Sequence, residues 1–345
     1  MSPPVTTPGR RRPGLRLGIN YPWRSYGWDF GDPPRSDKGN PWGEAAAWRH
    51  FVDSDLAAFR RLGLFAVRWF LLGDGLLYGT GKGQPRRDPQ SGQWRFPACP
   101  PVSESFVAHL RLLLERCRAA KMLLLPSLVD FHIGLPGQPV AGASAYVKCG
   151  RRDLFIDEAR RDQLFDEVLG ALLELAAQFR DVVYAIELVN EPEWLTRPQG
   201  DRPAAVDEEE MKEFIREGIG RINDAGFLST VGFADPATLG RWDSPRLGIT
   251  LHQIHYYPGD PLPRHVYDPR WPVIVGEFAT ARHRPWPELG TRQDLRSRLA
   301  HLEAKGYPVA FLWAADTWNR ESEEPHAVDW GEANQQAVAR FLRGG

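Results

Sequence analysis

Eight short runs of apolar, often β-branched residues recur along this chain of 345 residues, and they limit what it can fold into. Most of the runs are continuously apolar rather than alternating, which is typical of strands that are buried on both faces, as in a parallel sheet. We therefore expect strands at Leu15–Asn20, Phe65–Phe70, Met122–Leu128, Val182–Asn190, Leu228–Phe233, Gly248–His255, Pro272–Glu277 and Pro308–Trp313.

Segments with helical periodicity lie between these runs. In the clearest, Glu158–Arg180, apolar residues recur every three or four positions, as on one face of an amphipathic helix. Alternation of strands and helices without a repeat or a linker predicts an α/β protein with a single (β/α)8, or TIM, barrel. The other helices are expected at Ala45–Arg61, Ser103–Ala120, Asp207–Asp224, Thr291–Lys305 and Glu332–Leu342, with a brief one near Pro236–Trp242.

The connections differ in length between the two ends of the predicted barrel. Helix-to-strand connections are short, such as Gly63-Leu64 and Gly306-Tyr307. Long loops gathered at the C-terminal ends of the strands predict that this end carries the functional site. The long strand-to-helix connections are Tyr21–Gly43, Leu71–Pro100, Val129–Asp157, Pro192–Val206 and Ala314–Trp330.

Two glutamates stand at the C-terminal ends of predicted strands. Glu191 lies in Asn190-Glu191-Pro192 after the fourth strand, and Glu277 lies in Gly276-Glu277-Phe278 at the end of the seventh. Two carboxylates presented in this way suit the cleavage of a glycosidic bond. One can donate and then remove a proton, while the other attacks or stabilises the sugar cation.

Short segments on successive strands, taken in their order along the chain, resemble the clan A glycoside hydrolases. The similarity is closest to family 5, the cellulase and mannanase family, and covers about residues 15–320. The segments are Leu17–Asn20, Val67–Trp69, Asp130–His132, Glu187–Pro192, His255–Tyr257, Gly276–Phe278 and Phe311–Trp313.

The resemblance implies a retaining β-glycoside hydrolase that needs no cofactor and no metal. Its substrate would be a β-linked glucoside or mannoside, as an oligosaccharide or a polysaccharide. Glu191 would be the acid/base and Glu277 the nucleophile. Arg68 takes the place of the arginine that braces the nucleophile, and Trp313 that of the floor of the sugar site.

Residue chemistry extends this candidate site. Asn190 can hydrogen-bond a sugar 2-hydroxyl, and Tyr257 can donate to Glu277. His132 and His255 can bind hydroxyls or orient the two glutamates, and ordinary core or rim histidines are the alternative. We expect Arg68 to contact Glu277, Glu187 or both, because a buried guanidinium needs a carboxylate partner. Glu193, on the loop after the motif, is predicted to be a surface charge.

Tryptophans in loop-like segments are candidates for binding further sugars. Several of the 13 tryptophans lie beside Gly, Pro or Asp, and aromatic faces on loops commonly stack on sugar rings. Trp23, Trp28 and Trp194 are the loop candidates for additional sugar subsites, and plain loop packing is the alternative for each.

Composition excludes some functions and leaves others open. A formal net charge of −1 does not favour a nucleic-acid or anionic-membrane partner, and no apolar run is long enough to span a bilayer. We place the barrel at residues 15–345, after a Pro- and Arg-rich lead-in over residues 1–14 that we expect to be disordered and that does not read as a secretory signal. Cys99, Cys117 and Cys149 are odd in number, which favours reduced thiols in a cytoplasmic protein; a secreted protein is the alternative. The oligomeric state stays open.

Two competing functions remain. A metal-dependent barrel hydrolase could use Asp130, His132, His252, His255 and Asp316 as ligands. However, His252 and His255 are three apart on a predicted strand, so they should point to opposite faces and cannot share one ion. A non-catalytic carbohydrate-binding barrel would keep the aromatics and usually lose one of the two carboxylates. The sugar, the linkage, endo or exo action, and hydrolysis or transglycosylation are not determined by the sequence.

Overall fold

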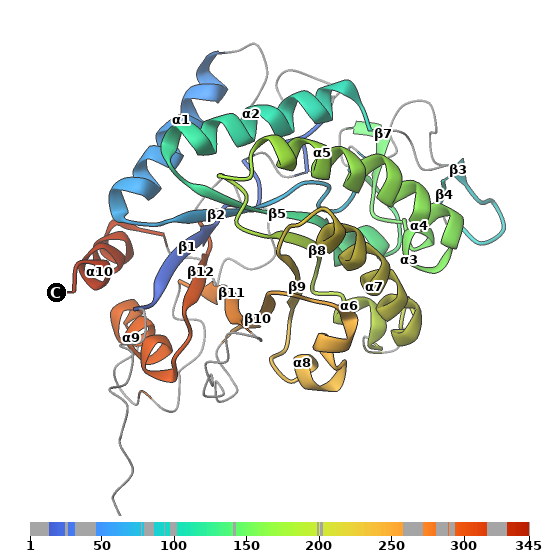
Figure 1. Ribbon diagram of the computed structural model, residues 1–345. Helices are drawn as coiled ribbons and strands as arrows, with labels where there is room; N and C mark the ends of the chain where they lie inside the picture. The colour runs from blue at the N-terminus through green and yellow to red at the C-terminus, as the bar shows by residue number, and fades with distance from the viewer. Residues whose placement is uncertain are drawn as a thin grey trace, which may run out of the picture.

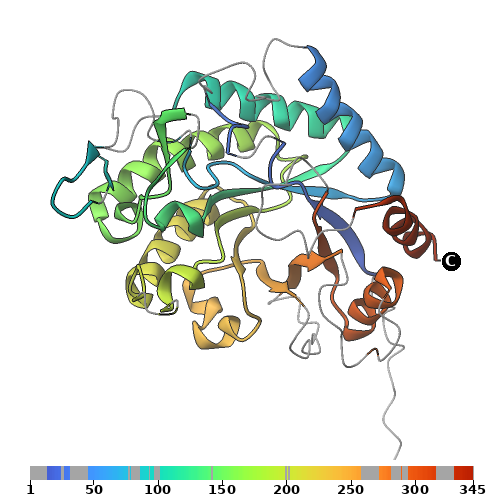
Figure 2. The same ribbon diagram turned by 180° about the vertical axis from the view of Figure 1, so that it is seen from behind.

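Eight parallel strands form a closed barrel with helices around it, which confirms the predicted (β/α)8 architecture (Figures 1 and 2). This computed structural model describes residues 14–24, 27–31, 46–76, 78, 86–92, 94–96, 102–140, 143–198, 200, 203–257, 272–280, 289, 294–315 and 330–344. The strand order is β1-β12-β11-β10-β9-β8-β5-β2. The barrel strands are β1 (Arg16–Asn20), β2 (Ala66–Phe70), β5 (Leu123–Asp130), β8 (Ile186–Asn190), β9 (Ser229–Phe233), β10 (His252–Tyr256), β11 (Val273–Ala279) and β12 (Val309–Trp313).

Each strand overlaps its predicted run, and the two largest differences are at strand starts. Strand β8 begins at Ile186 rather than Val182, because the amides of Val182 and Val183 bond back to the Phe179 carbonyl in a turn. Strand β10 begins at His252, because residues 244–247 form a 3-10 turn that ends at Gly248 with a φ of 79°. Such a positive φ is readily adopted by glycine.

Helices cover the outside of the barrel at the predicted positions. Ser103 caps α2 (Glu104–Ala120) by accepting from the Phe106 amide. Asp207 with Glu210 forms a capping box at the start of α7 (Glu208–Asp224). The long predicted helix is α4 (Glu158–Leu164) and α5 (Gly170–Gln178), joined by a π-helical turn at Phe165–Leu169. The others are α1 (Ala46–Leu62), α2 (Glu104–Ala120), α3 (Asp153–Ile156), α6 (Glu193–Thr196), α7 (Glu208–Asp224), α8 (Thr238–Arg241), α9 (Leu295–Lys305) and α10 (Glu332–Leu342).

The strand-to-helix connections carry additional small elements. The hairpin of β3 (Arg86–Arg87) and β4 (Trp94–Arg95) follows β2. After β5 come the 3-10 turn η2 (Phe131–Gly134) and the hairpin of β6 (Gln138–Val140) and β7 (Ala143–Lys148). This elaboration lies at the C-terminal ends of strands, where the long connections were predicted.

The membrane, cysteine and lead-in expectations can be compared with the structure in turn. Among the described residues, no helix is both long and apolar enough to cross a bilayer. Cys117 and Cys149 are buried free thiols, and burial raises the pKa of each to about 12. Cys99, Asp316 and the lead-in up to residue 13 lie outside the described residues.

The inside of the barrel changes from apolar to polar along the strands. Ala66, Leu125, Ala185 and Leu251 belong to a small buried cluster inside the barrel, together with Phe311. Two residues further along the chain from each of the first four, Arg68, Ser127, Glu187 and Gln253 lie in β2, β5, β8 and β10 and are also fully buried. Side chains two apart on a strand share a face, so a polar layer lies directly above an apolar one. The polar layer is the base of the candidate site.

Candidate active site

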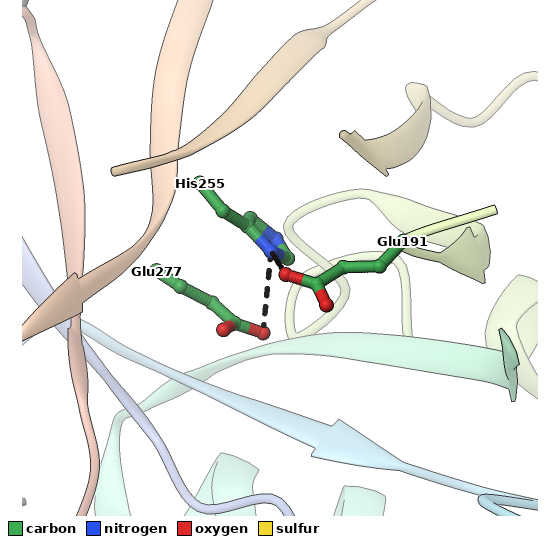
Figure 3. Close-up of side chains that lie close together, drawn as sticks. All are labelled: Glu191, His255 and Glu277. Carbon is green, nitrogen blue, oxygen red and sulfur yellow. Dashed lines mark hydrogen bonds and ion pairs between the residues drawn. The ribbon is translucent and has the colours of Figure 1, made fainter. Parts of the chain in front are cut away.

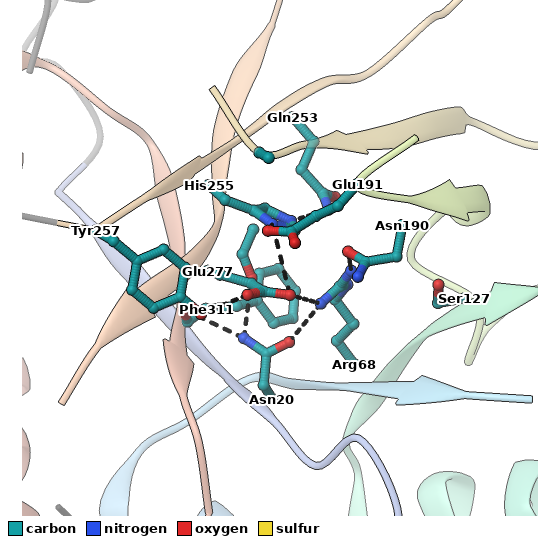
Figure 4. Close-up of polar contacts among 12 residues, drawn as sticks. Asn20, Arg68, Ser127, Asn190, Glu191, Gln253, His255, Tyr257, Glu277 and Phe311 are labelled. Carbon is teal, nitrogen blue, oxygen red and sulfur yellow. Dashed lines mark hydrogen bonds and ion pairs between the residues drawn. The ribbon is translucent and has the colours of Figure 1, made fainter. Parts of the chain in front are cut away.

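Arg68 is the centre of the polar layer and is fully buried (Figure 4). Its Nε and Nη2 donate to Glu187 Oε2 and Oε1 at 2.7 and 2.6 Å, and its Nη1 donates to Glu277 Oε1 at 2.7 Å. The prediction that Arg68 contacts Glu187, Glu277 or both is therefore confirmed for both. Two amide oxygens take the remaining donors, Asn20 Oδ1 at 2.8 Å and Asn190 Oδ1 at 2.7 Å. All five N–H groups of the guanidinium thus have partners.

The ion pairs decide the charge state of Arg68. Burial alone would lower the pKa of Arg68, but the carboxylates of Glu187 and Glu277 more than offset it, so that the pKa is raised. Ser127 Oγ and Gln253 Nε2 also donate to Glu187, at 2.9 and 2.8 Å. A buried pair with this many hydrogen bonds is costly to break, because loss of one partner leaves an uncompensated charge. The network therefore fixes Glu277 from the base of the site.

A β-bulge in β8 turns two consecutive side chains toward the mouth. Pairing with β9 shifts register between Glu187 and Asn190, so one extra residue of β8 is accommodated there. Glu191, directly after the strand, has a φ of 47°, in the left-handed region that non-glycine residues seldom adopt. As a result Asn190 contacts Arg68, while Glu191 reaches past β9 to His255 of β10.

Two glycines make room for the polar layer. Residue Gly276 is the bulged position of β11, because Ile254 pairs with Val275 while His255 pairs with Glu277. A Cβ at Gly276 would lie 2.4 Å from the Gln253 amide, and one at Gly232 would lie 2.8 Å from His255 Nε2. Any larger residue at either position would displace the side chains that support the glutamates.

The two predicted catalytic glutamates meet at the barrel mouth, with His255 beside both (Figure 3). One carboxylate oxygen of Glu191 and one of Glu277 lie within 4.8 Å of each other. His255 Nδ1 lies 2.7 Å from Glu191 Oε1 and 3.5 Å from Glu277 Oε1. The Tyr257 hydroxyl donates to Glu277 Oε2 at 2.5 Å. The arrangement therefore contains a carboxylate with fixed donors beside a second carboxylate that a histidine orients.

The hydrogen bonds assign the tautomer of His255. Its Nε2 lies 3.3 Å from Gln253 Nε2, an amide nitrogen whose orientation is set by its bond to the Glu187 carboxylate. A nitrogen that faces an amide donor accepts, so the ring proton resides on Nδ1 and is donated to Glu191. Burial lowers the pKa of His255, and the nearby Arg68 charge acts in the same direction, whereas Glu277 opposes it. The ring is therefore a neutral donor to Glu191.

Opposing effects act on the ionisation of Glu277. Burial, the largest of them, raises the pKa of Glu277 above its ordinary value, and the Glu191 charge adds to this. His255, Arg68 and the Tyr257 hydroxyl act in the opposite direction and favour the carboxylate. A poorly solvated carboxylate that accepts two hydrogen bonds is fixed in position and more basic than one in water.

Asp130 connects Asn190 to His132. Asn190 Nδ2 donates to Asp130 Oδ2 at 2.6 Å, and the other carboxylate oxygen of Asp130 contacts the amide and Nδ1 of His132. Burial alone would raise the pKa of Asp130, but His132 and Asn190 more than offset it, so that the pKa is lowered. The pair places His132 at the rim of the site, with its side chain 45% exposed.

The predicted tryptophans occupy different environments. Trp313 ends β12, partly buried and paired in register with Ala279 of β11, the strand of Glu277. Trp23 is partly buried beside Phe70. Trp194 is 41% exposed and donates from Nε1 to Glu191 Oε2 at 2.8 Å.

The prediction that Trp28 stacks on a sugar is wrong. It is buried, with its ring edge-on to that of Tyr146 at 5.2 Å, so loop packing rather than sugar stacking describes this residue. The neighbouring Gly27 and Asp29 lead to the prediction of an exposed loop, because small and acidic residues are usually solvated. In the fold, that loop lies against the connection after β5, which supplies Tyr146.

Glu193 was predicted to be a surface charge, and this prediction is wrong. Its side chain is fully buried at the start of α6 and accepts from the amides of Ala234 and Asp235 at 3.2 and 3.4 Å. Burial raises the pKa of Glu193. The carboxylate ties the connection after β9 to the one that carries Glu191.

Sequence reasoning missed Gln253 and Ser127 of the polar layer. Both are polar residues inside otherwise apolar strands, and Gln253 is two positions before His255, on the same face. A polar residue an even number of positions before a site residue, within a buried strand, is the signal that would have revealed Gln253.

Glu191, His255 and Glu277 also form the one cluster of metal-ligand type among the described residues. The donor set does not fit a cation well, because Glu277 already accepts from Arg68 and Tyr257, and the guanidinium charge lies beside it. His252 lies on the opposite face of β10 and bonds to Ser244 Oγ at 2.9 Å, as expected for residues three apart on a strand. His252 is therefore not available as a ligand for the metal-dependent alternative.

No family model and no curated protein sequence matches the chain, whereas solved structures do. The endo-1,4-β-mannanase from Eisenia fetida has a TM-score of 0.66 at 17% identity, covering 97% of this chain and 92% of that one. The β-mannanase from the blue mussel Mytilus edulis has a TM-score of 0.63 at 16% identity, covering 96% and 92%. A variant of GH5_18 from Streptomyces cattleya, in complex with Manβ1-4GlcNAc, has a TM-score of 0.58 at 16% identity, covering 95% and 80%. This chain therefore has the fold of family 5 glycoside hydrolases, which the strand motifs indicated.

Proposed function

We propose that this protein is a retaining β-glycoside hydrolase with Glu191 as the acid/base and Glu277 as the nucleophile. The observation that carries the proposal is the approach of the two carboxylates to within 4.8 Å across the barrel mouth. This fits the roughly 5–5.5 Å between carboxyl groups in retaining enzymes, and it is shorter than the roughly 6.5–9.5 Å of inverting ones.

In the first step Glu277 attacks the anomeric carbon while Glu191 gives its proton to the departing glycosidic oxygen. A glycosyl ester of Glu277 forms, and the leaving group departs as an alcohol. Arg68 and Tyr257 hold one oxygen each of the attacking carboxylate, at 2.7 and 2.5 Å. Asn190, fixed between Arg68 and Asp130, offers its amide to the sugar 2-hydroxyl.

In the second step Glu191, now ionised, removes a proton from a water whose oxygen attacks the anomeric carbon. The ester bond breaks, Glu277 is released as a carboxylate, and one water has been consumed. The His255 Nδ1–H stabilises the ionised form of Glu191 between the two steps, through the contact of 2.7 Å. Two inversions at the anomeric carbon give net retention.

The substrate that we propose to test first is a β-linked mannoside. Support comes from solved structures with this fold that are mannanases or hold a β-mannosyl sugar, although a β-glucoside suits the same chemistry. Trp313 is proposed to face the sugar nearest the cleaved bond, while Trp23 and Trp194 contact further sugars and His132 a hydroxyl at the rim.

The test is a screen of 4-nitrophenyl β-mannoside and β-glucoside together with β-1,4-linked manno- and gluco-oligosaccharides, with NMR of the first product. Turnover with the β-anomer formed first supports the proposal, and an α-anomer formed first contradicts retention. Sugar binding without turnover would indicate a carbohydrate-binding barrel. Activity that a chelator abolishes and a metal ion restores would indicate the metal-dependent alternative.

A further inference from the structure

Trp194 connects the proposed acid/base to an aromatic surface at the rim of the site. Its indole Nε1 donates to Glu191 Oε2 at 2.8 Å, while 41% of the residue remains exposed. The ring of Trp194 lies 6.2 Å from that of Phe131, and Phe131 stacks on His132 with ring centroids 4.0 Å apart. We refer to Phe131, His132 and Trp194 as the rim rings.

The rim rings lie on the acid/base side of the mouth. They follow the adjacent strands β5 and β8, whereas Glu277 comes from β11, with β9 and β10 between. A general acid protonates the departing oxygen, so the leaving group lies beside the acid and away from the nucleophile. The leaving-group sugar, whose oxygen Glu191 protonates, is thus adjacent to the rim rings.

We propose that the rim rings bind the leaving-group sugar, a β-linked pyranose, through its apolar face, and that Trp194 is also a positioning residue that holds Glu191. This inference rests on the proposed glycosidase function and specifies which side of the cleaved bond these rings serve. It assigns two separable roles to Trp194. The ring binds sugar, and the indole N–H fixes one oxygen of the carboxylate while His255 fixes the other.

The indole N–H also affects when Glu191 carries its proton. A donor favours the carboxylate over the carboxylic acid, so removal of this donor favours the protonated, acid-competent form. The alkaline limb of the pH–activity profile, where the general acid is lost, should then move to higher pH. The titratable groups around Glu191 are His255, Glu277, His132 and Glu193, and a substitution of Trp194 changes none of them.

Four variants separate the two roles. Trp194→Phe keeps a ring and loses the N–H, Trp194→Ala loses both, and Phe131→Ala removes a neighbouring ring that does not bond to Glu191. Trp330→Phe is the matched control, because Trp330 packs against Phe59 of α1. Each is assayed with a β-1,4-linked disaccharide, which has a sugar leaving group, and with the corresponding β-glycosyl fluoride, which has none.

Trp194→Phe should leave KM for the disaccharide nearly unchanged and move the alkaline limb upward by about one pH unit. Trp194→Ala should show the same pH shift and also raise KM for the disaccharide about tenfold, with KM for the fluoride unchanged. Phe131→Ala should raise KM for the disaccharide without a pH shift. Trp330→Phe should match the wild type in all respects.

Different failures overturn different parts of the account. An unshifted pH profile in Trp194→Phe overturns the positioning role, and an equal rise of KM for both substrates overturns the leaving-group assignment. Wild-type protein that cleaves neither substrate overturns the proposed function itself and this inference with it. Wild-type cleavage with unchanged variants overturns this inference alone.

Discussion

The two sides of the barrel mouth hold their glutamates in different ways. The Glu277 side chain is buried, 4% exposed, and bonds to a charged arginine that is itself held by Glu187. The Glu191 side chain is 15% exposed and bonds to two neutral donors, His255 and Trp194. A nucleophile, which forms a covalent bond, benefits from a fixed position. An acid/base needs access to the leaving group and to water, and hydrogen-bond partners that allow both its protonated and its ionised form. A substitution on the Glu277 side of the mouth should therefore leave the Glu191 side intact, and the reverse.

Removal of the nucleophile should have the largest effect. Glu277→Ala should reduce turnover by about 10⁴-fold or more on every substrate, because no other group in the site can form the glycosyl ester. Azide, which fits the space left by the side chain, should restore turnover and give a glycosyl azide of inverted configuration. The measurement is steady-state kinetics with and without azide, followed by NMR of the product. Glu303→Gln is a control that should keep wild-type turnover, since the Glu303 carboxylate of α9 accepts from the Leu15 amide rather than from Arg68. A Glu277→Ala variant that keeps activity without azide would contradict the assignment.

Arg68→Lys tests the buried support of the nucleophile. Lysine keeps the charge but cannot reproduce the fork to Glu187 or reach Glu277 at the same time. We expect a loss of about 3–5 kcal/mol in the free energy of unfolding, measured by urea titration, with a fall in kcat.

Arg118→Lys is the matched control, because Arg118 forms the same fork with Asp181 at the surface, where the two side chains are 44% and 63% exposed. Its loss should stay below about 1 kcal/mol. Equal losses in the two variants would show that burial does not strengthen the Arg68 network.

Gly276→Ala should disturb the same side through shape alone. The new Cβ would lie 2.4 Å from the Gln253 amide and push it from Glu187. We expect about 1–3 kcal/mol of destabilisation and a lower kcat, as in other overpacked interiors. Gly240→Ala in α8, where a Cβ meets nothing within 4 Å, should be neutral or slightly stabilising. A Gly276→Ala variant as stable and active as the wild type would mean that the Gln253 contact is dispensable.

The smallest expected effect is a pH dependence of stability from His132 at the exposed rim. Burial alone would lower the pKa of His132, but Asp130 more than offsets it, so that the folded-state pKa is raised above the ordinary 6.5. The stability from His132 is therefore fully present below about pH 6.5 and is lost as the pH rises through the folded-state pKa. His132→Gln should be less stable than the wild type at pH 6, by under about 1 kcal/mol, and equal to it at pH 9. Urea unfolding at both values checks this, and a gap that widens with pH would contradict it.

The sequence predicted the strands, because they follow from local patterns, and the resemblance of the strand-end motifs supplied the candidate site residues. Continuous apolar runs mark strands that are buried on both faces, and the strand ends of a parallel barrel must meet. Together with the resemblance to family 5, this placed Arg68, His255 and Tyr257 near Glu277. Their partners followed from the need of a buried charge for a counter-charge.

The remainder depends on packing that no local pattern specifies. The bulge in β8 that turns Asn190 and Glu191 to the same mouth is a matter of register with β9. The burial of Glu193 depends on where α6 begins and on the nearby amides of the connection after β9. Trp28 is buried by a loop more than a hundred residues later in the chain.

The central claim is that Glu191 gives a proton to the leaving group and later takes one from water, while Glu277 attacks. Its most direct test is the rate of Glu191→Ala on β-glycosides whose leaving groups differ in acidity. We predict a large loss for poor leaving groups, which need protonation, and a burst of dinitrophenolate from an activated dinitrophenyl glycoside, which does not. Slow turnover should follow the burst and be relieved by azide, with a glycosyl azide of retained configuration. An equal loss for good and poor leaving groups would contradict the assignment of Glu191 as the acid and, with it, the central claim.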